Sequence, residues 1–157
     1  MDKIEIKNAT IIDGLGGDPY IGNIYLNNRK IIAITHEESF DSDISIDANG
    51  KVVTPGFIDL HTHSDLSFLL DSKAQSKVRQ GVTMELIGNC GMSDAAPVRD
   101  HTKELLMMKL SRYGDAGDIA DKIGWADYAG YINASKKRGA TLNIAFQVGH
   151  ATLRSAV

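Results

Sequence analysis

The sequence predicts an α/β fold in two parts: a small antiparallel β unit over residues 1–54, followed by parallel βα units over residues 55–157. In the first part, apolar residues alternate with polar ones, which is the period-2 pattern of half-buried strands. In the second part, short apolar runs alternate with longer segments of helical character, which indicates strands alternating with helices. Glycines stand at the ends of these segments, where the chain must turn.

The first part is expected to consist of short strands separated by tight turns. Two of these strands flank the loop Asn27-Asn28-Arg29, whose composition is typical of a β-hairpin. A second turn signal, Asn49-Gly50, precedes the last strand. The expected strands cover residues 4–6, 11–12, 23–26, 30–34, 44–46 and 51–53.

The second part is expected to contain three strands that run parallel, because helical segments separate them. The expected strands cover residues 57–63, 82–87 and 142–148. The expected helices cover residues 73–80, 100–113 and 125–138. Glycines at 81, 114 and 139 end the three helices, and Gly88 closes the second strand.

Composition limits the class of protein. The net charge of −3 gives no basic surface of the kind that binds nucleic acid. Cys90 is the single cysteine, so no internal disulfide can form, which suits a reducing compartment. The N-terminal residues lack the apolar core of a signal peptide, and no apolar run approaches the roughly 18 residues that span a bilayer. We therefore expect a cytoplasmic enzyme with neither a nucleic-acid nor a membrane partner.

Two histidines separated by one residue, His61 and His63, form the most informative motif. They follow the turn Pro55-Gly56 and an apolar run. In a strand, residues i and i+2 point to the same face, about 6–7 Å apart along the backbone. Two imidazoles on one face at the end of a strand can lean onto one metal ion, which points to hydrolytic chemistry. The alternative is a pair of surface or core histidines.

Cys90 follows the second expected strand of the parallel part. The carboxyl ends of neighbouring parallel strands lie side by side, and functional groups collect there. Cys90 is therefore expected at the same edge as His61 and His63. A thiolate is a strong zinc ligand, and the flanking Gly88 and Gly91 allow the backbone to turn the sulfur inward. The alternative reading is a small buried apolar side chain.

These residues resemble a known family. Residues 55–65, with the sequence PGFIDLHTHSD, look like the first barrel strand of the amidohydrolase superfamily. The segments Gln80-Gly81-Val82-Thr83, Gly88-Asn89-Cys90-Gly91 and residues 148–154 narrow the resemblance to its N-acyl-D-amino-acid deacylase branch, the D-aminoacylases. The resemblance covers essentially the whole chain.

The resemblance implies a fold, a cofactor and an activity. The fold would be an incomplete metal-dependent (β/α)8 barrel, of which residues 55–157 supply the first three strands, and residues 1–54 a small β domain that a C-terminal segment completes. His61, His63 and Cys90 would bind zinc, with Cys90 in the place where many relatives have a carboxylated lysine. Hydroxide formed from zinc-bound water would attack the amide carbonyl of an N-acyl amino acid, a linear C–N bond that is not a peptide bond.

The family pattern also contains later histidine ligands and a catalytic aspartate, which lie beyond Val157, so no catalytic acid–base residue is assigned. Two alternatives stay open: a catalytically inert N-terminal fragment or part of a split enzyme that pairs with a complementary C-terminal chain, and another amidohydrolase such as a cyclic-amide hydrolase. Asp65 and His150 are candidates for supporting or mouth positions. The acyl group, amino-acid side chain, enantiomer, number of metal ions and oligomeric state stay open.

Overall fold

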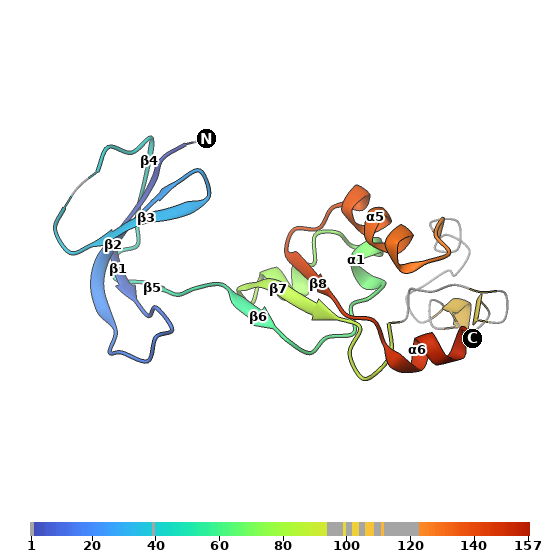
Figure 1. Cartoon of the computed structure of the whole chain (residues 1–157). Helices are drawn as coiled ribbons and strands as arrows, with labels where there is room; N and C mark the ends of the chain where they lie inside the picture. The colour runs from blue at the N-terminus through green and yellow to red at the C-terminus, as the bar shows by residue number, and fades with distance from the viewer. Residues whose placement is uncertain are drawn as a thin grey trace. The chain divides into compact units, whose positions relative to one another are not determined.

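The computed structural model describes residues 2–38, 40–93, 99, 102–103, 106–108, 111 and 123–157. The helix expected over residues 100–113 falls largely outside these described residues. The chain divides into two units, Met1–Pro55 and Gly56–Val157, each with its own core (Figure 1). Every helix in the described ranges is too short or too polar to cross a lipid bilayer.

The first unit is a five-stranded sheet. Its strands are β1 (Ile4–Ile11), β2 (Tyr20–Asn27), β3 (Lys30–Thr35), β4 (Ile44–Asp47) and β5 (Val52–Val53). The strand order is β3-β2-β1-β4, and β5 also pairs with β1. β2 and β3 form the hairpin that the Asn27-Asn28-Arg29 loop predicts, with Asn28 and Arg29 both at positive φ.

The expectation of an antiparallel unit is correct for only part of this sheet. β2 runs antiparallel to β1 and β3, but β4 and β5 run parallel to β1. After β3 the chain returns to the beginning of β1, where the backbone N–H groups of Asp43 and Ile44 donate to the carbonyl of Lys3. β4 therefore starts beside the start of β1. Apolar alternation predicts which face of a strand is buried and carries no information about its direction.

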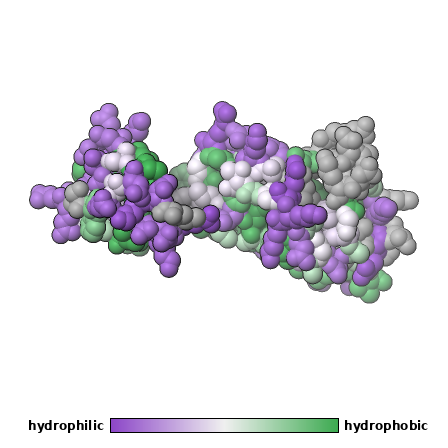
Figure 2. Space-filling view, turned by 90° about the horizontal axis from the view of Figure 1, so that it is seen from above, coloured by the Kyte–Doolittle hydropathy of each residue, from purple (hydrophilic) through white to green (hydrophobic). Residues whose placement is uncertain are grey.

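One face of this sheet carries the core of the unit. Ala9, Ile11, Ile24 and Ala48 are buried there. Several large apolar side chains of the unit remain exposed, notably Ile31 at 61 %. Figure 2 shows such apolar side chains among the hydrophilic ones on the surface.

The second unit contains a three-stranded sheet, β6 (Phe57–Asp59), β7 (Val82–Ile87) and β8 (Asn143–Phe146), in the order β6-β7-β8. Both pairings are parallel, as expected. The helices are α1 (Ser67–Leu70), α2 (Gln75–Val78), α5 (Tyr128–Arg138) and α6 (His150–Ser155).

The core of the second unit lies between its sheet and α5, which runs alongside β8 in Figure 1. Tyr131 of α5 is fully buried and meets the ring of Phe146 edge-on, with the ring centroids 5.6 Å apart. Ile87 of β7, Leu66 and Trp125 complete this cluster together with Leu106. Because Ile87 and Phe146 are the last residues of β7 and β8, α5 packs against the carboxyl ends of these two strands.

Several predicted boundaries are corrected by the structure. The first strand ends at Asp59 instead of His63, because the Asp59 carboxylate accepts a hydrogen bond from the backbone N–H of His61, and this local bond replaces strand pairing. The third strand is shorter than residues 142–148, and the helix expected over 73–80 covers only Gln75–Val78.

The helix expected from Trp125 begins three residues later. The side chain of Asp127 accepts a hydrogen bond from the N–H of Gly130, which makes Asp127 the N-cap of α5. The helix ends, as predicted, at Gly139, with φ of +72°. A short helix, α6, also begins at His150, a residue for which the sequence indicated a supporting or mouth position.

Candidate metal centre

His61 and His63 lie in the irregular segment just after β6, and both are exposed. Their ring centroids are 5.7 Å apart. Between them, Thr62 is buried, so the side chains alternate between solvent and interior although the strand itself has ended. The two histidines therefore point to the same side, as the sequence predicted. They do so in an extended segment that lacks strand pairing.

Cys90 lies at the end of β7 in an unusual backbone conformation. Its φ is +55°, between Gly88 at +83° and Gly91 at +74°. For a residue with a Cβ atom this left-handed conformation costs about 1–2 kcal/mol, and such strain persists only where the surrounding structure fixes it. Gly88 is needed for a second reason, since a Cβ there would lie 2.1 Å from the carbonyl oxygen of Gln147.

The three predicted ligands form one cluster. Nε2 of His61 lies 3.1 Å from Sγ of Cys90. His61, His63 and Cys90 each offer one ligand atom, and these atoms lie within 4.8 Å of one another. Ligand atoms on a common tetrahedral zinc ion are about 3.3–3.8 Å apart, from Zn–N and Zn–S bond lengths of about 2.0–2.3 Å. Small rotations of exposed side chains would therefore bring all three onto one ion.

The chemistry of these donors fits zinc. Two imidazole nitrogens and one thiolate suit a borderline-soft divalent ion, whereas magnesium and calcium prefer oxygen ligands. Three protein ligands and an exposed position also match zinc sites that keep one coordination position open for water or substrate. The observed group of side chains is thus chemically capable of holding a hydrolytic zinc ion.

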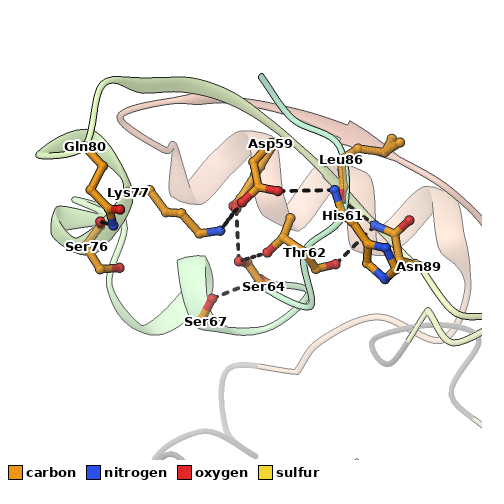
Figure 3. Close-up of polar contacts among 11 residues, drawn as sticks. Asp59, His61, Thr62, Ser64, Ser67, Ser76, Lys77, Gln80, Leu86 and Asn89 are labelled. Carbon is orange, nitrogen blue, oxygen red and sulfur yellow. Dashed lines mark hydrogen bonds and ion pairs between the residues drawn. The ribbon is translucent and has the colours of Figure 1, made fainter. Parts of the chain in front are cut away.

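We call residues 61–64 the histidine segment. A network of polar side chains supports it on the side opposite the two imidazoles (Figure 3). The hydroxyl groups of Thr62 and Ser64 lie 2.6 Å apart, and Ser64 donates to a carboxylate oxygen of Glu85 at 3.0 Å. Glu85 lies on β7 and is fully buried. The residues that alternate with the two histidines are thus attached to the strand that leads to Cys90.

Lys77 of α2 joins this network from the other side. Its ammonium group donates to Asp59 and lies 3.9 Å from a carboxylate oxygen of Glu85. The hydrogen bond from Lys77, followed by that from the backbone N–H of His61, holds the pKa of Asp59 below its usual value. Asp59, the last residue of β6, is therefore a charged carboxylate that accepts hydrogen bonds on two sides just before the histidine segment begins (Figure 3).

The two further candidates, Asp65 and His150, do not belong to the three-residue cluster. Asp65 is buried, and its backbone carbonyl accepts a hydrogen bond from the Tyr131 hydroxyl. Burial, and after it the charge of Asp65, raises the pKa of Tyr131, which keeps that hydroxyl a donor. His150 is exposed at the start of α6.

The sequence interpretation missed the supporting residues Ser64, Lys77 and Glu85. The sequence carries a signal for two of them, Glu85 and Ser64. Glu85 is a charged residue inside the otherwise uncharged strand of residues 82–87, and such a residue needs a buried partner. Thr62 and Ser64 alternate with the histidines, so they must face the opposite side.

Comparison with known proteins places this geometry in context. Residues 45–157 match the family described as the amidohydrolase family. An N-acyl-D-glutamate deacylase of Alcaligenes xylosoxydans xylosoxydans is 36 % identical over 152 residues, which are 96 % of this chain and 29 % of that protein.

Two solved structures are also similar. The zinc complex of the N-acyl-D-glutamate deacylase from Bordetella bronchiseptica, bound to a phosphonate that mimics the tetrahedral intermediate, has a TM-score of 0.74 and 33 % identity, over 96 % of this chain and 30 % of that one. A D-aminoacylase structure has a TM-score of 0.79 and 31 % identity, over 98 % and 31 %. The chain thus spans less than a third of the length of these relatives.

Proposed function

This chain belongs to the amidohydrolase family, and from that membership we propose that it is the metal-binding N-terminal part of an N-acyl-D-amino-acid deacylase. The observation that carries the proposal is the convergence of His61, His63 and Cys90 within 4.8 Å. The names of the similar proteins favour the deacylase branch, since they act on N-acyl-D-glutamate or are D-aminoacylases. The proposed substrate is therefore a small N-acyl amino acid.

The proposed fold follows from the same relatives. β6, β7 and β8 would be the first three strands of a (β/α)8 barrel, whose functional groups gather at the carboxyl ends of the strands. His61, His63 and Cys90 all follow strand ends of this kind. The five-stranded unit of residues 1–55 would be the part of a small β domain that this chain supplies.

The proposed metal is zinc, held by His61, His63 and Cys90. When bound, zinc supplies a Lewis acid for the amide carbonyl and lowers the pKa of water enough to make it a nucleophile near neutral pH. The chain's own contribution is to keep the two imidazoles on the solvent side. Thr62 and Ser64 do this by facing inward toward Glu85, which fixes the alternation of the segment.

Because the chain spans 29 % of its deacylase relative, hydrolysis is proposed for a protein that combines this segment with the remainder of the fold. The test adds purified chain, loaded with zinc, to the separately produced remaining part of the Alcaligenes deacylase. Release of D-glutamate from N-acetyl-D-glutamate is then measured. We expect zinc-dependent release from the mixture, loss of release with Cys90→Ala, and normal release with His36→Ala, which alters an exposed histidine of the first unit.

Two outcomes would contradict the proposal. One is a folded, zinc-loaded mixture that releases no amino acid from N-acyl-D-amino acids. The other is faster hydrolysis of a cyclic amide such as a dihydropyrimidine, which would favour a cyclic-amide hydrolase. Testing the chain alone in parallel separates an independent enzyme from one that needs a complementary chain.

A further inference from the structure

The side-chain amide of Asn89 connects the two halves of the candidate metal centre. Its Nδ2 atom donates to the carbonyl oxygen of Leu86 at 2.7 Å and to that of Thr62 at 3.2 Å. An amide nitrogen carries two hydrogens, so it can make both bonds at once. Figure 3 shows the Asn89 side chain beside His61, between these two backbone positions.

The two carbonyls belong to the segments that carry the proposed ligands. Thr62 lies between His61 and His63, and Leu86 belongs to β7, the strand that leads to Cys90. Asn89 itself directly precedes Cys90. One partly buried nitrogen atom therefore connects the histidine segment to residues 88–91, which we call the cysteine loop.

The cysteine loop is fixed from its opposite side by backbone contacts. The carbonyl of Gly91 accepts a hydrogen bond from the N–H of Ala151 at 2.8 Å, at the beginning of α6. The approach is close, since a Cβ at Gly149 would lie 2.3 Å from the same carbonyl oxygen. The loop is thus attached to α6 on one side, and Asn89 attaches it to the histidine segment on the other.

We propose that Asn89 is the positioning residue of the metal centre, which holds Cys90 at bonding distance from the ion that His61 and His63 bind. This inference rests on the proposed metal site. Cys90 needs such support because its φ of +55° is unfavourable for a residue with a side chain. Loss of the amide frees the loop to relax, and the sulfur then moves away while the imidazoles stay in place.

The chain offers a matched control for this residue. Asn143, at the start of β8, also donates from Nδ2 to a backbone carbonyl of the neighbouring strand, that of Thr83 at 3.1 Å. Thr83 lies near the beginning of β7, at the opposite end of the sheet from Cys90. Asn89→Leu and Asn143→Leu therefore remove the same kind of bond, and only the first removes it at the metal centre.

The experiment titrates cobalt(II) into the full chain and records the near-ultraviolet thiolate-to-cobalt charge-transfer band. Wild type and Asn143→Leu should show this band with equal affinity. Asn89→Leu should bind cobalt about 10–100-fold more weakly, the usual effect of losing a partner that orients a metal ligand. Its charge-transfer band should weaken for each bound cobalt ion, because the sulfur is displaced. Asn89→Asp, which keeps the shape and adds an attractive charge, should weaken the band for each bound cobalt ion as well.

Thermal unfolding of each variant without metal separates positioning from general stability. A wild-type band in Asn89→Leu or in Asn89→Asp would overturn the proposal. Unfolding of both Asn89 variants, while Asn143→Leu stays folded, would also overturn it, because Asn89 would then be a general stabilising residue. Absence of the band in wild type and in Asn143→Leu would contradict the metal centre itself.

Discussion

The Nε2 atom of His61 lies 3.1 Å from the Sγ atom of Cys90, although 29 positions separate these residues in the sequence. Parallel pairing of β6 with β7 accounts for this proximity, because it brings the carboxyl ends of both strands to the same edge. His63 lies in the same group of potential ligand atoms. Each of the three side chains is expected to bind the metal.

Replacing His61, His63 or Cys90 by alanine should remove stoichiometric zinc. A direct ligand contributes more than an orienting partner, so the loss of affinity should exceed about 10–100-fold. The measurement is zinc content after dialysis. His36→Ala is the control, since His36 is exposed in the first unit and lies against the carbonyl of Ile21. Equal zinc in all four variants would exclude this ligand set.

Gly88→Ala should destabilise the second unit by at least about 2 kcal/mol, as positive φ costs about 1–2 kcal/mol and overpacking adds about 1–3 kcal/mol. The new Cβ would meet the Gln147 carbonyl. Gly91→Ala is the control, because Gly91 also has positive φ but a Cβ there would meet Ala151 only at the ordinary contact distances of 3.8 and 3.9 Å. This control should lower the free energy of unfolding only by the conformational cost of positive φ, about 1–2 kcal/mol. Urea unfolding measures both, and equal effects would show that close approach of the strands is unimportant.

Asp127→Ala should lower the free energy of unfolding by about 1 kcal/mol, the typical effect of removing an N-cap. The Asp127 side chain accepts a hydrogen bond from the N–H of Gly130 in the first turn of α5. Asp127→Asn keeps an acceptor at this position and should remain close to wild type. Unfolding can be followed through the fluorescence of Trp125, which is the single tryptophan of the chain. Identical stabilities for the two variants would contradict the capping role.

The first unit should lose stability in acid through Glu5. A hydrogen bond from the Tyr25 hydroxyl, the largest effect, lowers the pKa of Glu5 below its ordinary value of 4.5; burial opposes this, and Ser45 and Lys7 lower the pKa further. A lowered folded-state pKa gives stability that is present above the ordinary value and lost as pH falls through the folded-state value.

Tyr25→Phe tests this linkage. The variant should lose part of the stability near neutral pH, and its difference from wild type should shrink below about pH 4.5. Urea unfolding of the first unit at several pH values measures this difference, with NMR signals from residues of β1 and β2 as the probe. Tyr20→Phe is the control, because the Tyr20 ring instead lies near His36. A pH dependence of Tyr25→Phe equal to that of wild type would disprove the linkage.

Much of the second unit could be predicted from local sequence. β7 has the predicted bounds, since its apolar run ends at Gly88, and the positive φ at that position favours glycine. The directions of β4 and β5 could not be predicted, because strand direction depends on a long-range return of the chain to Lys3. The start of α5 was missed for a different, local reason: Asp127 accepts a hydrogen bond from the N–H of Gly130, and apolar periodicity does not encode such a cap.

The convergence of His61, His63 and Cys90 could be predicted from their spacing and from the parallel arrangement of strands, but the particular hydrogen bonds around them could not. Ser64 and Glu85 are 21 positions apart and Thr62 and Asn89 are 27 positions apart, and each pair makes contact only when β6 and β7 pair. Their roles depend on distances between atoms, to which spacing along the chain gives no access.

X-ray absorption at the zinc edge of the zinc-loaded chain tests the central claim most directly, because it reports the atoms bound to the metal. One sulfur at about 2.3 Å and nitrogen or oxygen ligands at about 2.0–2.1 Å are expected in wild type. The sulfur should disappear in Cys90→Ser, since Cys90 is the single cysteine. A wild-type zinc shell without sulfur, or one unchanged in Cys90→Ser, would contradict the account.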